Sequence, residues 1–144
     1  MKKGGEYPTS RSALMTSLHK AQTGGNWLSQ DALADISDEL NVPAAAVKGI
    51  ATFYSLYRHA PSGRNIIQIC TNVACMVMGV ERLVDLLMKE FGLEPGGTSK
   101  DGRFSLVIME CIGACGTAPA MLVNDDFHES LDEKNIIEIL NGYT

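Results

Sequence analysis

The segments Cys70-Thr-Asn-Val-Ala-Cys75 and Cys111-Ile-Gly-Ala-Cys115 contain all four cysteines of this chain, as a C-x4-C pair and a C-x3-C pair. Two such pairs can converge on one point if each lies at the end of a strand and the two strands are neighbours in a sheet. A convergent group of thiols binds zinc or an iron–sulfur cluster. Zinc knuckles mostly use C-x2-C pairs, whereas a [2Fe–2S] cluster places two thiolates on each of two irons and accepts wider pairs. The spacing therefore favours the cluster, with a structural zinc site as the alternative.

Strands and a helix are predicted around these cysteines. An apolar run over residues 66–69 ends at Cys70 and has the continuous hydrophobicity of a buried strand. Helical periodicity follows over Val77–Phe91, and a second apolar run, Phe104–Met109, leads to Cys111. A strand, a crossover helix and a second strand form a right-handed unit with parallel strands, so both cysteine loops are expected to emerge from the same edge of the sheet.

The sequence after the second cysteine pair predicts a β-hairpin and a final helix. The hairpin turn is expected at Asn124-Asp125, and Ser130 with Glu133 forms a capping-box pattern before a short amphipathic helix. A strand–helix–strand unit followed by a hairpin and a helix is the element order of a thioredoxin-like fold. Pro119 lies just before the hairpin, where such folds often place a cis-proline, although most X-Pro bonds are trans.

Helical periodicity dominates the N-terminal part of the chain. Helices are expected from Arg11 to Gln22, from an N-cap at Ser29 to a stop at Asn41, and after Pro43, which suits a first helical position. Gly49 in the third helix indicates the close approach of another backbone. The apolar stripes of these helices are too narrow to form a second independent core. A linker over residues 58–63 then precedes the first strand.

Composition and charge exclude several protein classes. The 144 residues are 45% hydrophobic and 20% charged, as in an ordinary globular protein. The net charge is −5, and Lys48 is the only basic residue between Ser29 and Tyr57, so neither a helix-turn-helix function nor another nucleic-acid partner is expected. The polar residues 1–10, which we expect to be mobile, lack the apolar core of a secretory signal, and no apolar run reaches the ~18 residues that span a membrane. We therefore expect a cytoplasmic protein whose cysteines are ligands and not disulfides.

Several catalytic functions lack their sequence motifs. The three histidines, His19, His59 and His128, are far from the cysteine pairs in the sequence and are expected at the surface or as caps. The absence of C-x-x-C argues against a thiol oxidoreductase despite the predicted fold. With no Walker motif and no G-x-G-x-x-G at the start of a helix, the chain is not expected to bind nucleotide or flavin itself. Electrons for a bound cluster would therefore come from another protein.

Small and apolar residues surround the cysteines. Gly79, Gly113 and Gly116 would let backbone N–H groups approach the sulfurs and tune a reduction potential, or they serve turn geometry alone. The segment Met76-Val77-Met78 would screen a cluster from water, or it is plain packing. The sequence leaves both choices open.

Three segments resemble the thioredoxin-like [2Fe–2S] subunit family of NADH dehydrogenases, the small partner of the flavin- and NADH-binding subunit in complex I. They are Cys70-Thr-Asn-Val-Ala-Cys75, Glu110-Cys-Ile-Gly-Ala-Cys-Gly-Thr-Ala-Pro119 and Gly49-Ile-Ala-Thr-Phe-Tyr-Ser55. The similarity extends from about Leu14 to Asn141, which is nearly the whole chain. Homologous subunits also serve NAD-linked hydrogenases and formate dehydrogenases, and the sequence does not separate these parents.

The resemblance implies an α/β chain with an N-terminal helical segment, residues 1–60, and a thioredoxin-like [2Fe–2S] ferredoxin domain, residues 64–144. The family's ligands for one [2Fe–2S] cluster correspond to four cysteines: Cys70, Cys75, Cys111 and Cys115. The implied role is a non-catalytic electron-transfer subunit that exchanges single electrons with the flavin of a partner, which alone binds FMN and NADH. Further iron–sulfur subunits are expected, and the complex would hold the chain at the inner face of the membrane without insertion into it. A structural zinc module and a free-standing ferredoxin are the alternatives.

The helical segment needs a function of its own, because residues 64–144 already contain the predicted strands and all the cysteines. Its aromatic side chains offer the rigid area that protein interfaces favour. They are Trp27, Phe53, Tyr54 and Tyr57. We therefore expect this segment to dock the chain on the flavin-binding subunit.

Overall fold

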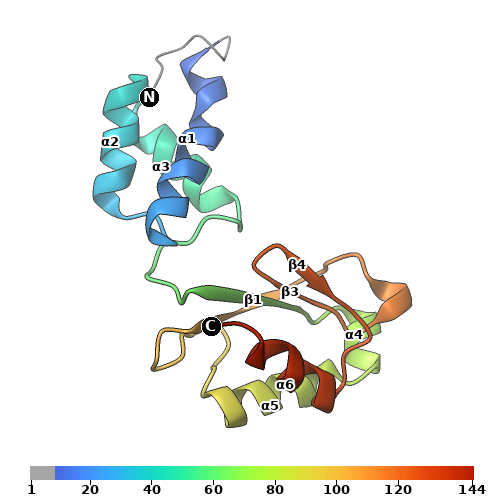
Figure 1. Cartoon of the computed structure of the whole chain (residues 1–144). Helices are drawn as coiled ribbons and strands as arrows, with labels where there is room; N and C mark the ends of the chain where they lie inside the picture. Colours follow the sequence, from blue (N-terminus) through green and yellow to red (C-terminus); the bar gives the residue numbers. More distant parts are fainter. Residues whose placement is uncertain (1–8) are drawn as a thin grey trace. The chain divides into compact units, whose positions relative to one another are not determined.

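The computed structural model describes residues 9–144. The chain divides into two compact units, with the boundary between Pro61 and Ser62 (Figure 1). Nearly all of the N-terminal stretch that we expect to be mobile lies outside the described residues, and the first helix already begins at Ser10. None of the helices in the described part is long and apolar enough to cross a membrane.

Three helices form the first unit: α1 (Ser10–Gly25), α2 (Gln30–Leu40) and α3 (Ala44–Phe53). The predicted N-cap of α2 is confirmed, because the Ser29 hydroxyl accepts a hydrogen bond of 3.1 Å from the N–H of Ala32. The predicted stop at Asn41 is also confirmed, with φ at 50°.

Two helix ends differ from the prediction. α1 continues past Gln22 to Gly25, because the left-handed cap is Asn26, with φ at 61°, and not the glycine pair. Pro43 is the N-cap of α3 and not its first helical residue. Its fixed φ of −51° suits either position, so the sequence could not distinguish them.

The first unit has a hydrophobic core of its own, so the expectation that its stripes are too narrow is wrong. The core gains residues from the segments between and after the helices, which periodicity within one helix does not reveal. Its buried side chains are Leu14, Leu18, Leu28, Leu33, Ile36, Val42, Val47, Ala51 and Tyr57. The buried Gln22 side chain also joins α1 to the end of the unit, donating to Leu56 O at 2.9 Å and accepting from the N–H of Arg58 at 2.7 Å.

The close backbone approach that we expected at Gly49 is absent: a Cβ there would meet no atom within 4 Å. Gly49 is exposed on α3. The tight position is Gly63, where a Cβ would lie 2.6 Å from the carbonyl carbon of Phe104. A sequence pattern cannot reveal this contact, because it joins residues that are far apart in the chain.

We expect Gly63→Ala to lower the free energy of unfolding by about 1–3 kcal/mol, the range for overpacking. The atoms that the new Cβ would meet are backbone atoms of a paired strand, which cannot move aside cheaply. The change would also disturb the hydrogen bond of 2.8 Å from the Gly63 N–H to the Ser105 hydroxyl. Denaturant titration measures the effect. Gly49→Ala is the matched control and is expected to be neutral or stabilising, because it adds a methyl group to an open helical position.

A four-stranded sheet with the order β2-β1-β3-β4 forms the centre of the second unit. β1 (Asn65–Cys70) and β2 (Phe104–Met109) are parallel, as predicted, with Cys70 opposite Met109. β3 (Met121–Val123) and β4 (Asp126–His128) form the predicted antiparallel hairpin around Asn124-Asp125.

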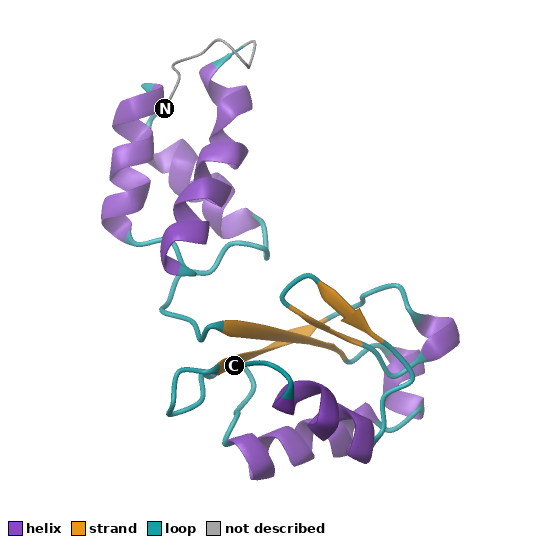
Figure 2. Ribbon diagram, viewed as in Figure 1, coloured by secondary structure: helices purple, strands orange, loops and turns teal. Residues whose placement is uncertain are grey.

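Three α-helices complete the second unit: α4 (Val73–Val77), α5 (Val80–Phe91) and α6 (Glu133–Asn141). α5 and α6 lie on the same face of the sheet (Figure 2). Their buried side chains form one core with those of the strands, and each fully buried Leu or Ile contributes about 1.5–3 kcal/mol. The element order is the one expected of a thioredoxin-like domain.

Two local features of this unit differ from the prediction. The helix expected over roughly Val77–Phe91 begins later, at Val80, because Gly79 takes φ at 88°, and the short helix α4 before it was not predicted. The capping box of α6 is formed by Asp132 and Asn135 and not by Ser130 and Glu133. Ser130 instead takes a left-handed conformation with φ at 51°.

The cis peptide bond expected before Pro119 is present.

Candidate iron–sulfur site

The four cysteines lie on two loops at one edge of the sheet. Cys70 is the last residue of β1, and Cys75 lies in α4. Cys111 follows β2, and Cys115 begins the short 3-10 helix η1 (Cys115–Thr117). Because β1 and β2 are parallel, both loops leave the sheet at the carboxyl ends of the strands.

The thiols contact one another within this edge. The Cys70 thiol hydrogen-bonds with the thiols of Cys75 and Cys111, and Cys75 interacts electrostatically with Cys115. All four are free thiols and not disulfides. The structure thus places the four cysteines on two loops at one edge of the sheet, with Cys70 hydrogen-bonded to a thiol of each loop.

Burial and hydrogen bonding shift the pKa values of the two buried cysteines, Cys70 and Cys75. Burial by itself would raise the pKa of Cys70, but bonds from the backbone N–H groups of Asn72 and Ile112 and from the neighbouring thiols lower this pKa below its ordinary value. Burial raises the pKa of Cys75, and the adjacent Cys70 raises it further. Cys70 is therefore the thiol of this pair that is better prepared to act as a thiolate ligand.

One of the three predicted glycine contacts is present. The Gly113 N–H donates to the Cys111 sulfur at 3.3 Å. The Gly79 N–H instead donates to Met76 O at 2.9 Å, and Gly79 separates α4 from α5. Gly116 lies inside η1, which fits the turn role. The two donors to Cys70, Asn72 and Ile112, were missed because any residue type can present an N–H when the loop directs it.

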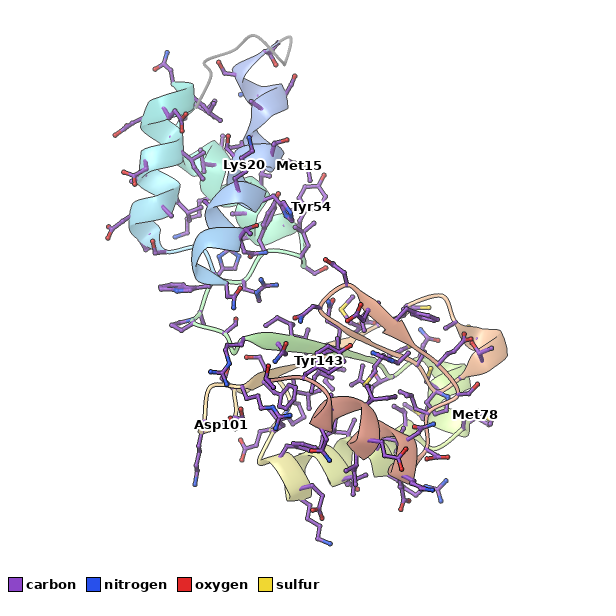
Figure 3. All side chains as sticks on the ribbon, in the orientation of Figure 1. Met15, Lys20, Tyr54, Met78, Asp101 and Tyr143 are labelled. Carbon is purple, nitrogen blue, oxygen red and sulfur yellow. The ribbon has the colours of Figure 1, made fainter. Side chains whose placement is uncertain are left out.

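The segment Met76-Val77-Met78 does not shield the thiols from water as a buried lid would. Its side chains are 49%, 81% and 59% exposed, and Val73 on the same helix is 72% exposed. The labelled Met78 projects outward beside α4 (Figure 3). Cys111 and Cys115 are exposed as well, whereas Cys70 and Cys75 are buried. One side of the site is thus open.

The histidines are not part of this site. His19 and His59 are exposed residues of the first unit, as expected, and the His59 ring nitrogen lies 3.0 Å from Ala51 O. His128 is half-buried on β4, and its Nε2 lies 2.9 Å from the Tyr143 hydroxyl.

The donor set consists of four thiols from two loops. Among the described residues, no three His, Cys, Asp or Glu side chains gather around a single point as one metal ion requires. The thiols instead form an extended set in which Cys70 contacts both Cys75 and Cys111. A [2Fe–2S] cluster spreads its four thiolate ligands over two irons, and these residues therefore fit it.

Comparison with known proteins agrees with this chemistry. Residues 2–144 match the family model described as thioredoxin-like [2Fe-2S] ferredoxin. One of the NADH-quinone oxidoreductase subunits of Rhizobium meliloti (strain 1021) is 39% identical over 137 residues, which are 95% of this chain and 82% of that protein. An NADH-quinone oxidoreductase subunit of Aquifex aeolicus (strain VF5) is 32% identical over 138 residues, covering 96% of this chain and 86% of that protein.

A solved structure shares the fold. The crystal structure of an NAD+-reducing [NiFe]-hydrogenase in the air-oxidized state superposes with a TM-score of 0.76 at 28% identity. The match covers 90% of this chain but 23% of that chain, so this chain spans less than a quarter of the hydrogenase chain. Together with the match over residues 2–144, these similarities show that the chain belongs to the family of thioredoxin-like [2Fe-2S] ferredoxins.

Proposed function

We propose that this chain is an electron-transfer subunit of an NADH-linked oxidoreductase complex, with one [2Fe–2S] cluster held by Cys70, Cys75, Cys111 and Cys115. The observation that carries the proposal is that two loops at the carboxyl edge of β1 and β2 carry four free thiols, with Cys70 hydrogen-bonded to a thiol of each loop. The relatives from Rhizobium meliloti and Aquifex aeolicus are named as subunits of NADH-quinone oxidoreductases, which supports the kind of complex.

The protein's own groups prepare the site for one-electron chemistry, which the cluster supplies when it is bound. The N–H groups of Asn72, Ile112 and Gly113 point at sulfur and stabilise negative charge there. The paired ends of β1 and β2 fix where the two cysteine loops begin. The sulfurs can therefore stay in place when the charge of a bound cluster changes by one electron. The exposed side, with Cys111 and Cys115, is the side from which an electron partner can come close.

The flavin and the nicotinamide belong to the partner in this proposal. The sequence has no nucleotide-binding motif, so a neighbouring subunit would bind FMN and NADH and perform the hydride chemistry, and this chain would be non-catalytic. Further iron–sulfur subunits would carry the electrons onward. The four free thiols favour a reducing compartment, and we place the chain on the cytoplasmic side, at the inner face of the membrane through its complex. Hydrogenase and formate dehydrogenase complexes are the alternative parents.

We expect the anaerobically purified chain to contain one [2Fe–2S] cluster, with iron and acid-labile sulfide in near-equal amounts. One-electron reduction is expected to make it paramagnetic. Because all the ligands are thiolates, its potential is expected near the ~−400 mV of plant-type ferredoxins and below the Rieske range. Metal and sulfide analysis with paramagnetic resonance measures these properties. Stoichiometric zinc without sulfide in fresh protein would contradict the proposal and favour the zinc module.

A further inference from the structure

The second cysteine pair lies in less regular structure than the first. Cys70 ends a paired strand and Cys75 lies in a helix with a side-chain N-cap, and both are buried. Cys111 and Cys115 are exposed, and Cys115 begins η1, a three-residue helix without a side-chain cap. A site of fixed geometry therefore needs some other contact to hold the Cys115 turn.

The segment 129–131 supplies such contacts to the residues that follow Cys115. The Thr117 hydroxyl donates to the Glu129 carboxylate at 2.7 Å. The N–H of Ser130 donates to Thr117 O at 2.7 Å, and the N–H of Leu131 donates to Pro119 O at 3.1 Å. Three hydrogen bonds thus hold the chain just after Cys115. The bond between the Thr117 and Glu129 side chains has a charged acceptor, which makes it stronger than a bond between neutral groups.

The fastening segment is itself anchored. Leu131 is 5% exposed and belongs to the core of the second unit. The Asn135 side chain, which completes the capping box of α6, donates to Ser130 O at 3.0 Å. Ser130 takes the left-handed conformation, with φ at 51°, that costs a residue other than glycine some free energy. The segment is thus held by the core of the second unit and by α6, independently of the Cys115 turn.

We propose that Thr117 and Glu129 are positioning residues for the cluster: their hydrogen bond connects the exposed Cys115 turn to the anchored segment 129–131, which precedes α6, and keeps the Cys115 sulfur in place. The inference rests on the proposed function, since it presumes a [2Fe–2S] cluster at these cysteines. Neither side chain is itself a ligand. Their effect passes through the backbone between Cys115 and Thr117.

The test compares the full-length chain with Thr117→Val and Glu129→Ala. Each change removes one partner of the bond, and the rate at which a chelator extracts the cluster is expected to rise about tenfold, the lower end for contacts behind metal ligands. The paramagnetic spectrum of the reduced cluster is expected to shift, because the Cys115 sulfur would take a different orientation. Thr117→Ser keeps the hydroxyl and is expected to restore both properties.

Two comparisons separate this effect from general weakening of the fold. The double variant is expected to lose the cluster no faster than either single variant, because both changes remove the same bond. Thr52→Val removes a similar exposed hydroxyl bond, to Lys48 O at 2.9 Å in α3, and is expected to change neither property. Circular dichroism checks that the variants are folded.

The outcomes are distinct. Wild-type release rates and spectra in Thr117→Val and Glu129→Ala would overturn the inference, and so would additive effects in the double variant. Those results would leave the proposed function intact if the wild-type chain carries a [2Fe–2S] cluster. A wild-type chain without the cluster would overturn the proposed function and this inference together.

Discussion

Cys75→Ala is expected to abolish the [2Fe–2S] cluster or leave only a trace of it. Each iron needs two protein thiolates, and the change removes one of them. Cys75 is 2% exposed inside α4, so the change removes a thiol from the buried part of the site. Iron content, the visible spectrum and the paramagnetic signal measure the loss. The same result is expected for the three other changes: Cys70→Ala, Cys111→Ala and Cys115→Ala.

The loss is also expected to weaken the fold, because a ligand that binds only the folded state stabilises it. Thermal unfolding of the second unit is therefore expected at a lower temperature in each cysteine variant. His59→Ala is the control and is expected to keep the cluster, because His59 lies in the first unit and bonds to Ala51 O. A cysteine variant with wild-type spectra would have to be removed from the proposed ligand set.

The second large effect concerns the first unit, which we propose docks on the flavin-binding partner. A chain that starts at Ser62 is expected to keep the cluster spectrum and to lose co-purification with that partner. The first unit has its own core, so its removal leaves the core of the second unit complete. Starting at Ser62 also keeps the bond from Gly63 to Ser105.

The exposed aromatic residues identify which part of the first unit to test. Phe53 is 78% exposed and Tyr54 is 38% exposed, with their rings edge to face at 5.0 Å. Met15 is another exposed apolar residue of this unit, at 40%, and is labelled together with Tyr54 in Figure 3. Tyr57 was expected among the aromatic residues that contact the partner, but it is 5% exposed and donates to Met15 O at 3.0 Å, so it packs inside the first unit. Trp27 is half-buried.

Phe53→Ala in the full-length chain is expected to weaken binding to the flavin-binding partner by about 2 kcal/mol, which is the loss of one interface hot spot. This corresponds to a rise of roughly thirtyfold in Kd. Tyr54→Ala is expected to weaken it less, because less of that ring is exposed. Phe127→Ala is the matched control, since it removes a 47% exposed phenylalanine from β4 of the second unit. If the truncated chain binds the flavoprotein as tightly as the full chain, the docking surface lies on the second unit and the helices are a structural support.

The sequence determined the position of the cysteines within the fold. Continuous apolar runs set β1 and β2, and each run ends next to a cysteine pair, at Cys70 and Cys111. Parallel pairing of two strands joined by a crossover then brings the pairs to one edge, whatever the details of the loops. The caps at Ser29 and Asn41 were also predictable, because a cap is a contact between close neighbours in the chain.

The tertiary structure decided the features that depend on residues far apart in the sequence. The core of the first unit uses side chains from between the helices, and one N–H donor to Cys70 comes from Ile112 on the other loop. The hydrogen bond from Thr117 in η1 to Glu129 in the loop after β4 joins residues that are 12 positions apart. Periodicity reports which face of an element is buried, but it carries no information on which distant groups meet there, because that depends on how the whole chain packs.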